Sequence, residues 1–594
     1  MIGIFKKLFI IVDKKEKLYL YFFFTVLILF ALFDSFSLAL IIPLMELMIS
    51  FEDGIQNETL INIFNFFGLP TYGISMLYYV LTIFFVISLL KAVTQIFVYR
   101  MTAFIPYKIL FNKSLSLIDI YTKMPWQKFI TLNSNDLIKT ITKSNELNAY
   151  AYVVLLQFFT SVVVAIFLFS LLFIFNPVFT LSASIFLVLI SFIIVKYIRP
   201  VQQKGGEDRE NALSNIFIHA SELMLSMQEI RILNSISFFR KKFLKDASQL
   251  SNAFKVTTFY PPVPNVIIEI IAVAILMIIF LYILNSSIDF VSLFPSFVFI
   301  IAVARRLLPS VSQINSHFIT LKGLEPSINI IKEELSKKEY DDFEDVSRAK
   351  SDKKYKDWSE IKILNLDFSY NSKKVLRSLD INIIRGNSIA FVGPSGAGKT
   401  TLMNILLGLL KPNHGEIFFD NKLSDSFETL NNNVGLVPQI INIVDDTIEN
   451  NIVFGRAYDE EKLKRSIKIS NLNEVLNDLD NGLDTILGER GISLSGGQRQ
   501  RVAIARAIYN DPDLIIFDEA TSSLDNISEK IIKTTISDLS KHKTIISIAH
   551  RMNSIRDFDV IHVLEEGKIV CSGDYDYLIK NSDLFRKLTD SELN

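Results

Sequence analysis

Cysteine is almost absent from this chain. Cys571 is the only one among 594 residues, so no internal disulfide can form and redox chemistry at a cysteine pair is excluded. An excess of charge of one sign is also missing, because 61 basic side chains accompany 62 acidic ones and the net charge is −1. A chain without a basic excess is not held to nucleic acid by bulk electrostatics. We therefore expect no disulfide scaffold and no nucleic-acid partner.

Apolar residues, by contrast, are abundant and unevenly distributed. Half of the chain is hydrophobic and 49 residues are Phe, although 21% is charged. Each of six apolar segments is close to the roughly twenty residues that a helix needs to span a bilayer; they are 18–45, 74–99, 152–175, 178–198, 263–284 and 289–308. A buried helix of a large soluble protein is the alternative for any one segment. Six in series with few charges favour a membrane domain.

Lysine and arginine are distributed unequally between the loops. The segment 51–73 has neither, and the links at 176–177 and 285–288 are short. The start of the chain and the stretches 100–151 and 196–262 are basic, which by the positive-inside rule makes them cytosolic. We therefore expect a multi-pass protein of the inner membrane, with the second to fifth helices extending far into the cytosol.

The chain changes character after the last apolar segment. A dense run of mixed charges covers 336–358 and predicts a linker between two domains, 1–335 and 359–594. In the second domain, short β-rich runs alternate with helical stretches, a pattern typical of an α/β domain with a parallel sheet. The predicted organisation is a multidomain membrane protein, with an all-α transmembrane domain of six helices followed by an α/β domain in the cytoplasm.

A phosphate-binding motif follows the predicted strand SIAFVG. The residues from Gly393 to Thr400 fit the pattern G-x-x-x-x-G-K-T and open a predicted helix. In such a loop backbone N–H groups face the phosphates, the lysine reaches the outer phosphates and the last hydroxyl binds Mg²⁺. We expect ATP to contact Gly393, Ser395, Gly396, Gly398, Lys399, Thr400 and Thr401, with Thr400 on the metal.

Two acidic residues end an aliphatic run, DLIIFDE at 513–519. A buried strand there would deliver Asp518 to the metal and allow Glu519 to polarise the attacking water. An acidic pair at a strand end is more often an ordinary solvated turn. The pair gains meaning only beside the phosphate loop.

The string LSGGQRQR at 494–501 indicates the type of ATPase. With it, the region 359–590 resembles the ABC ATPase family, whose motifs occur here in the expected order. The resemblance implies that Tyr370 stacks on adenine, that Gln439 is the metal-binding Q-loop residue and that His550 is a catalytic switch histidine. It also matches 485–491 to the loop that touches the membrane domain in exporters and 522–525 to the D-loop. Taken alone, Tyr370 would be a packed aromatic at a strand end, Gln439 a turn residue and His550 a surface or core histidine.

The same resemblance implies how the ATPase works. In the family, the LSGGQ segment of one subunit closes on the nucleotide held by the other, so Ser495 and Gly497 would act in the partner's ATP site. A chain with one such domain then implies a homodimer with two identical sites for ATP and Mg²⁺. ATP would favour the closed dimer, and hydrolysis would release it.

Several strings in the membrane half are similar to one branch of exporters, the PglK-type flippases of lipid-linked oligosaccharides. They are ALFDSFSLALIIP around Asp34, MQEIRILN (227–234), VPNVIIE (263–269) and ARRLLPSVSQI (304–314). Charged residues at membrane depth are costly unless they face protein or water, so the candidates for an internal path are Asp34, Lys91, Glu269, Arg305 and Arg306. The guanidinium fork of Arg306 suits a pyrophosphate. The alternative is an interfacial arginine that reaches toward the cytosol or bonds a helix end.

The outer loop contains a short apolar helix candidate within 58–69, which would lie at the membrane surface or pack against the spans. Three hypotheses remain for the protein: a flippase for a polyprenyl-pyrophosphate-linked oligosaccharide, an exporter of another lipid, drug or peptide, or a chromosome-maintenance ATPase. The third uses a similar ATPase sandwich, but the apolar spans and the lack of coiled-coil heptads oppose it. Membrane lipids and an amphiphilic substrate are the expected partners.

Overall fold

The computed structural model describes residues 2–49, 74–175, 177–285, 290–337, 358–370, 373–424, 433–488, 491–519, 526–549 and 551–593. The chain divides into two compact units. The first comprises Met1–Met124 and Ile130–Tyr340, and the second comprises Pro125–Phe129 and Asp341–Asn594. The outer-loop helix candidate lies outside the described residues.

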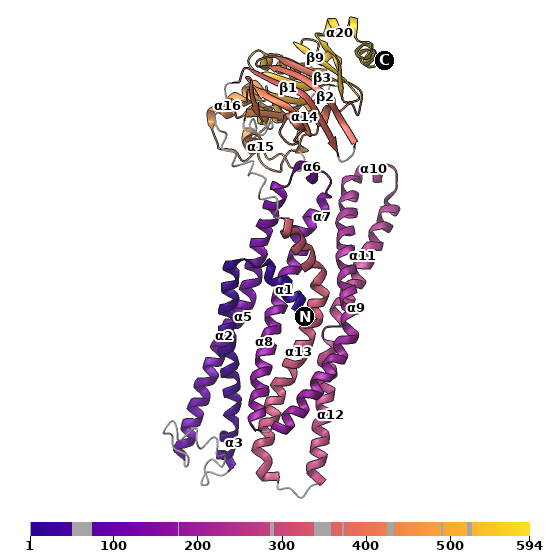
Figure 1. Ribbon diagram of the computed structural model, residues 1–594. Helices are drawn as coiled ribbons and strands as arrows, with labels where there is room; N and C mark the ends of the chain where they lie inside the picture. The colour runs from indigo at the N-terminus through magenta and orange to yellow at the C-terminus, as the bar shows by residue number, and fades with distance from the viewer. Residues whose placement is uncertain are drawn as a thin grey trace. The chain divides into compact units, whose positions relative to one another are not determined.

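The first unit is entirely helical (Figure 1). A π-helical turn, Thr140–Ser144, separates α7 from α8. The helices are α1 (Ile2–Ile11), α2 (Lys14–Ala39), α3 (Ile41–Ile49), α5 (Ile74–Lys123), α7 (Ser134–Lys139), α8 (Asn145–Phe175), α9 (Pro177–Leu225), α10 (Met227–Ile232), α11 (Ile236–Phe259), α12 (Val263–Asn285) and α13 (Phe290–Ser336).

Five stretches of the described residues are long and apolar enough to cross a membrane. They are Lys14–Met45, Leu77–Lys123, Ser134–Ile174, Thr180–Leu225 and Ile236–Ile275. Helix α13 contains residues 290–308 of the sixth predicted span. Helices α5 and α9 have 50 and 49 residues and enclose Pro106 and Pro200. Both are more than twice as long as a single span requires.

The first apolar segment is interrupted. Our prediction runs one helix over 18–45, whereas α2 ends at Ala39 and α3 begins at Ile41. Pro43 explains the break, because it has no N–H to donate to the carbonyl of Ala39. The helical bonds resume with Leu44, whose N–H donates to the Leu40 carbonyl at 3.3 Å.

Helices α9 and α13 cross closely at two glycines. A Cβ atom on Gly206 would lie 2.1 Å from the carbonyl oxygen of Gly323, so only glycine allows this approach. Arg209 Nη2 donates to the same oxygen at 3.1 Å. One turn after Gly206 in α9, the buried Glu210 accepts hydrogen bonds from Ser144 and Ser327. Backbone contact and buried polar bonds therefore join the π-helical turn, α9 and α13 at one level.

Two sheets form the second unit. The antiparallel sheet has the strand order β2-β1-β4-β5, with β1 (Glu360–Tyr370), β2 (Lys373–Ile384), β4 (His414–Phe419) and β5 (Lys422–Ser424). The other sheet has the order β10-β9-β3-β8-β7-β6, with β3 (Ser388–Val392), β6 (Val434–Val437), β7 (Leu514–Asp518), β8 (Thr544–Ile548), β9 (Val560–Glu565) and β10 (Lys568–Gly573). From β9 to β6 all neighbours are parallel.

The second unit also contains helices (Figure 1). They are α6 (Trp126–Phe129), α14 (Lys399–Leu406), α15 (Ile448–Val453), α16 (Glu460–Ile469), α17 (Asn473–Asn477), α18 (Gly496–Ile508), α19 (Asn526–Ser540), α20 (Tyr575–Asn581) and α21 (Asp583–Leu593). A separate apolar core joins α15, α16 and α17 to one face of α18. Because β3, β7 and β8 are parallel neighbours, the loops after them meet at one sheet edge.

Candidate functional site

The phosphate loop between β3 and α14 depends on glycine. Gly393 and Gly398 have φ values of 152° and 101°. A Cβ on Gly393 would lie 2.1 Å from the Leu564 carbonyl oxygen, and one on Gly398 would lie 2.7 Å from Leu376 Cδ2. Both conformation and space therefore require glycine at position 393, and the positive φ favours glycine at position 398. The loop has the backbone curvature of a phosphate cradle.

Lys399 begins α14 and lies under this loop. Its side chain is buried, and its Nζ donates to the carbonyl oxygens of Gly393 at 2.8 Å and Pro394 at 3.1 Å. Burial lowers the pKa of Lys399, while the charges of Glu519 and Asp518 oppose that shift. A desolvated cation held by neutral carbonyls is a strong partner for a phosphate. Ser395, Gly396 and Thr400 are exposed at the loop surface, whereas Thr401 is buried.

The acidic pair lies at the carboxyl end of β7. Asp518 is the last residue of the strand, and Glu519 follows with a φ of 48°. The N–H of Glu519 donates to the Ile548 carbonyl at 3.0 Å, and Gln439 Nε2 donates to Glu519 Oε2 at 2.5 Å. The fold thus brings Gln439, which follows β6, against the carboxylate that the sequence suggests as the base.

The residues fit a Mg²⁺ ion. Mg²⁺ is commonly held by one or two carboxylates together with phosphate oxygens. The Thr400 hydroxyl in α14, the Asp518 carboxylate at the end of β7 and the Gln439 amide oxygen after β6 are oxygen donors of the kind that Mg²⁺ binds. Within the described residues there is no group of three His, Cys, Asp or Glu side chains that could hold a metal by itself. A metal here therefore depends on the phosphates for further ligands.

The LSGGQ segment forms the beginning of α18. Ser495 is the N-cap and accepts from the Gln498 N–H at 3.2 Å, while the Gln498 side chain accepts from the Ser495 N–H at 2.8 Å. This capping box leaves Ser495 exposed at a helix N-terminus. Gly497 is buried, and a Cβ there would lie 2.3 Å from Ser528 Oγ in α19.

The remaining predicted nucleotide residues are less defined. Tyr370 ends β1 and packs edge to face on Phe368, with 4.9 Å between ring centroids. His550, the D-loop residues 522–525, and Glu489 and Arg490 of the 485–491 loop lie outside the described residues.

Three of the charged residues predicted for a membrane path form one cluster. Asp34 of α2 is only 1% exposed. Its Oδ1 is 2.6 Å from Lys91 Nζ of α5, and its Oδ2 is 3.2 Å from Arg306 Nε of α13. One carboxylate therefore faces two cations, and the cluster carries a net charge of +1. Arg305 and Glu269 are exposed and lie outside it.

Two members of this cluster are accessible. The Arg306 side chain is 41% exposed and that of Lys91 is 27% exposed, whereas the Asp34 side chain is 1% exposed. The carboxylate is thus enclosed, whereas the two cations are partly accessible. Hydropathy and charge mark each residue separately in the sequence, but their grouping depends on the packing of three helices.

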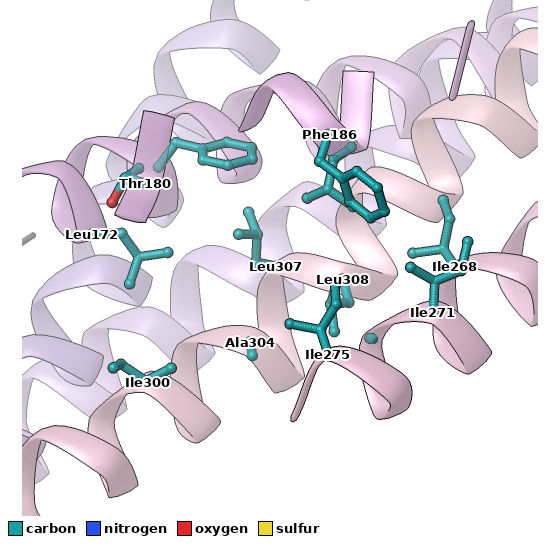
Figure 2. Close-up of a pocket in the computed structure, with 13 residues that line it drawn as sticks. Leu172, Thr180, Phe186, Ile268, Ile271, Ile275, Ile300, Ala304, Leu307 and Leu308 are labelled. Atoms are coloured by element: carbon teal, nitrogen blue, oxygen red, sulfur yellow. The ribbon is translucent and has the colours of Figure 1, made fainter. Parts of the chain in front are cut away.

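An apolar pocket lies among α8, α9, α12 and α13 (Figure 2). Its volume is about 110 Å³. It is lined by Phe169, Leu172, Thr180, Phe186, Leu187, Ile268, Ile271, Ala272, Ile275, Ile300, Ala304, Leu307 and Leu308. On α13, Ala304 and Arg306 are separated by about 200° around the helix axis. The pocket and the charged cluster therefore lie on different faces of α13. Sequence reasoning missed the pocket, because its residues differ in no way from other apolar residues of the spans.

Comparison with known proteins gives consistent results. Residues 376–522 match the family described as ABC transporter. The ATP-dependent lipid A-core flippase of Francisella tularensis subsp. tularensis (strain FSC 198) is 30% identical over 425 residues, which cover 69% of this chain and 68% of that protein. The protein of the same name from Escherichia coli (strain K12) is 30% identical over 419 residues, covering 68% and 70%.

The fold also matches a solved structure, that of a bacterial Atm1-family ABC exporter with ATP bound. The TM-score is 0.76 at 18% identity, over 98% of this chain and 99% of the other. Helical and α/β parts thus have the architecture of an exporter of this type.

Proposed function

Since this chain belongs to the ABC transporter family and is a membrane-embedded, ATP-driven exporter with a cytoplasmic ATPase domain, we propose that it translocates an anionic amphiphilic lipid. The best candidate is a polyprenyl-pyrophosphate-linked oligosaccharide, moved across the inner membrane. The observation that carries this proposal is the cluster of Asp34, Lys91 and Arg306, with its net charge of +1.

The charge of the cluster favours an anionic ligand. An uncompensated cation at membrane depth is costly, so such residues commonly belong to a substrate path. Asp34 balances only one of the two cations and holds Arg306 through Nε. A pyrophosphate close to Arg306 and Lys91 would balance the second, and a guanidinium and an ammonium both bind phosphate oxygens.

The apolar pocket on the other face of α13 supports the amphiphilic part of the proposal. A cavity lined by hydrocarbon stays dry and accepts apolar groups. The same helix would then offer a charged face to a head group and an apolar face to a chain. The relatives named lipid A-core flippases also favour a lipid. An exporter of another lipid, a drug or a peptide is the second candidate, and membership of an exporter family removes the support for a chromosome-maintenance ATPase.

The ATPase cycle follows from the proposed roles of the described residues. The glycine loop and Lys399 bind the phosphates, and Glu519, oriented by Gln439, accepts a proton from the attacking water. When bound by Thr400, Asp518 and Gln439, Mg²⁺ would neutralise charge that develops on the phosphates. Half-transporters of this family function as dimers; we propose a homodimer in which Ser495 and Gly497 complete the partner's site and His550 acts as the switch histidine.

Flipping of a fluorescent polyprenyl-pyrophosphate sugar in proteoliposomes tests the substrate. Arg306→Ala should remove most transport, and Arg306→Lys should recover part of it, because a point charge replaces a planar fork. Basal ATPase activity should largely remain in both variants. Arg305→Ala is the matched control, since Arg305 is the adjacent arginine outside the cluster. Wild-type transport by Arg306→Ala, or no transport of this lipid by the wild type, would favour the second candidate.

A further inference from the structure

Arg506, in the last turn of α18, connects this helix to the segment that follows Gln439. Its Nη1 donates to the Asn442 carbonyl oxygen at 2.9 Å, and its Nε donates to the Asn451 carbonyl oxygen at 2.8 Å. Its Nη2 donates to Asn451 Oδ1 at 3.1 Å. The guanidinium carbon also lies 4.2 Å from the centre of the Phe454 ring. One side chain thus contacts the glutamine segment, defined here as 439–447, and helix α15.

Asn451 extends the same connection. It is fully buried, and its Nδ2 donates to the carbonyl oxygens of Val444 at 2.9 Å and Thr447 at 3.0 Å. Its Oδ1 accepts from the Val444 N–H at 2.9 Å as well as from Arg506. The amide therefore holds the far end of the glutamine segment while Arg506 holds its middle. Breaking one bond of such a buried network leaves polar groups unpaired, which is costly.

The guanidinium is suited to this position. Burial is the main cause that lowers the pKa of Arg506 to about 10, and the positive charge of Arg456 is the smaller cause. The side chain therefore remains charged at neutral pH. A planar fork fixes the direction of several bonds at once, which an ammonium group cannot do. The link between α18 and Asn442 is therefore directional as well as attractive.

Resting on the ATPase roles proposed above for Ser495, Gln439 and Glu519, we propose that Arg506 is a positioning residue for ATP hydrolysis. It would transmit the placement of the LSGGQ helix to Gln439 and through it to Glu519. Ser495 caps the N-terminus of α18, and Arg506, in the last turn of the same helix, donates a hydrogen bond to the Asn442 carbonyl oxygen. Asn442 is three residues from Gln439, which donates to Glu519. A shift of α18 when Ser495 engages nucleotide would thus displace the amide that orients the carboxylate.

Arg456 provides a matched control. It also joins α15 to α18, because its Nε donates to the Val453 carbonyl oxygen at 2.8 Å and its Nη2 donates to those of Ile452 at 2.6 Å and Arg506 at 2.8 Å. Its guanidinium lies 4.8 Å from the centre of the Tyr509 ring. Arg456 thus stabilises the same two helices, and none of these three hydrogen bonds reaches the glutamine segment.

The experiment compares Arg506→Lys and Arg456→Lys in the full-length protein reconstituted in lipid nanodiscs. ATP affinity, thermal stability and the turnover number per nucleotide-binding molecule are measured. Arg506→Lys should reduce turnover about tenfold with unchanged ATP affinity, because the oriented contact with Asn442 is lost. Arg456→Lys should lower stability without changing turnover per binding-competent molecule. Unchanged turnover in Arg506→Lys would overturn the proposal.

A second step separates positioning from a general weakening of the domain. In a Gln439→Ala background, Arg506→Lys should reduce turnover no further, because its effect passes through the missing amide. Additive losses would contradict the proposed path. Should Arg506→Lys fail to fold, Phe454→Leu removes only the ring contact from a half-exposed position. In the otherwise wild-type protein, Phe454→Leu should lower turnover about twofold to threefold. In the Gln439→Ala variant it should lower turnover no further. Any other pattern counts against the proposed role of Arg506.

Discussion

Glu519 adopts a backbone conformation that few residues other than glycine take. Its φ of 48° lies in the left-handed region. The N–H bond to Ile548 and the side-chain bond from Gln439 hold it there. Strained residues persist where the surrounding structure determines them, and they are common at active sites. The conformation turns the chain out of β7 at the point where a carboxylate is needed beside the phosphate loop.

Replacement of this carboxylate tests its role as the base. Glu519→Gln keeps the shape and size of the side chain but cannot accept a proton, so ATP should still bind while turnover falls about 100-fold or more. The closed dimer should accumulate. ATPase assays and nucleotide-binding measurements on the purified protein distinguish the two effects.

Glu566 offers a matched control, because it is also a glutamate with a positive φ, 46°, but lies in the turn between β9 and β10. Glu566→Gln should hydrolyse ATP at the wild-type rate. Near-normal turnover in Glu519→Gln would rule out the assigned role.

Gly206 and Gly323 determine how closely α9 can approach α13. A side chain at Gly206 must displace the backbone of the other helix, since the nearest atom to a new Cβ is a carbonyl oxygen at 2.1 Å. Backbone yields less readily than a flexible side chain. A side chain at Gly206 would therefore disturb the crossing of α9 and α13. It would also disturb the buried hydrogen bonds of Arg209 and Glu210 beside the crossing.

Gly206→Ala should thus destabilise the helical unit, by about 1–3 kcal/mol as for other overpacked sites. Thermal unfolding of the purified protein, followed by circular dichroism, measures the change. Gly3→Ala is the control, because a Cβ at Gly3 meets no atom within 4 Å. Equal midpoints for the two variants would show that the crossing can relax.

Part of this architecture can be read from the sequence. Long apolar segments identify the membrane helices because the bilayer sets their length. The phosphate-loop and acidic motifs lie at the ends of β3 and β7, where the parallel sheet brings loops together, while the LSGGQ motif begins α18. The break at Leu40 also had a signal, Pro43, which the predicted first span ran through. Hydropathy finds a helix but does not show which faces meet.

Contacts between distant elements are what the sequence does not reveal. Asp34 and Arg306 are 272 residues apart in the chain, and nothing in either segment indicates the other. Arg506 similarly stands out in no motif, because two of its hydrogen bonds go to backbone carbonyls, which every residue carries. Pairings of this kind depend on the three-dimensional packing of helices that have similar patterns.

The proposed homodimer makes each ATP site depend on two chains. If Ser495 of one chain serves the phosphate loop of the other, a dimer with Lys399→Ala on one chain and Ser495→Arg on the other retains one intact site. A dimer in which one chain carries both changes and the other is unmodified has none, because each site receives one defect.

ATPase assays on mixed dimers, isolated with two different affinity tags, should therefore show residual activity in the first arrangement and almost none in the second. The doubly changed homodimer sets the background rate. Full activity in the dimer of a doubly changed and an unmodified chain would contradict sites shared between chains.

The length of α5 and α9 has a mechanical consequence. A continuous helix of 50 residues is about 75 Å long, so a tilt of only about 5° at one end displaces the other by about 6 Å. A small rearrangement among the spans would therefore displace the far end of the helix by more than the rise of one helical turn. Because the helix is continuous, a displacement of its far end would in turn tilt the part that lies among the spans.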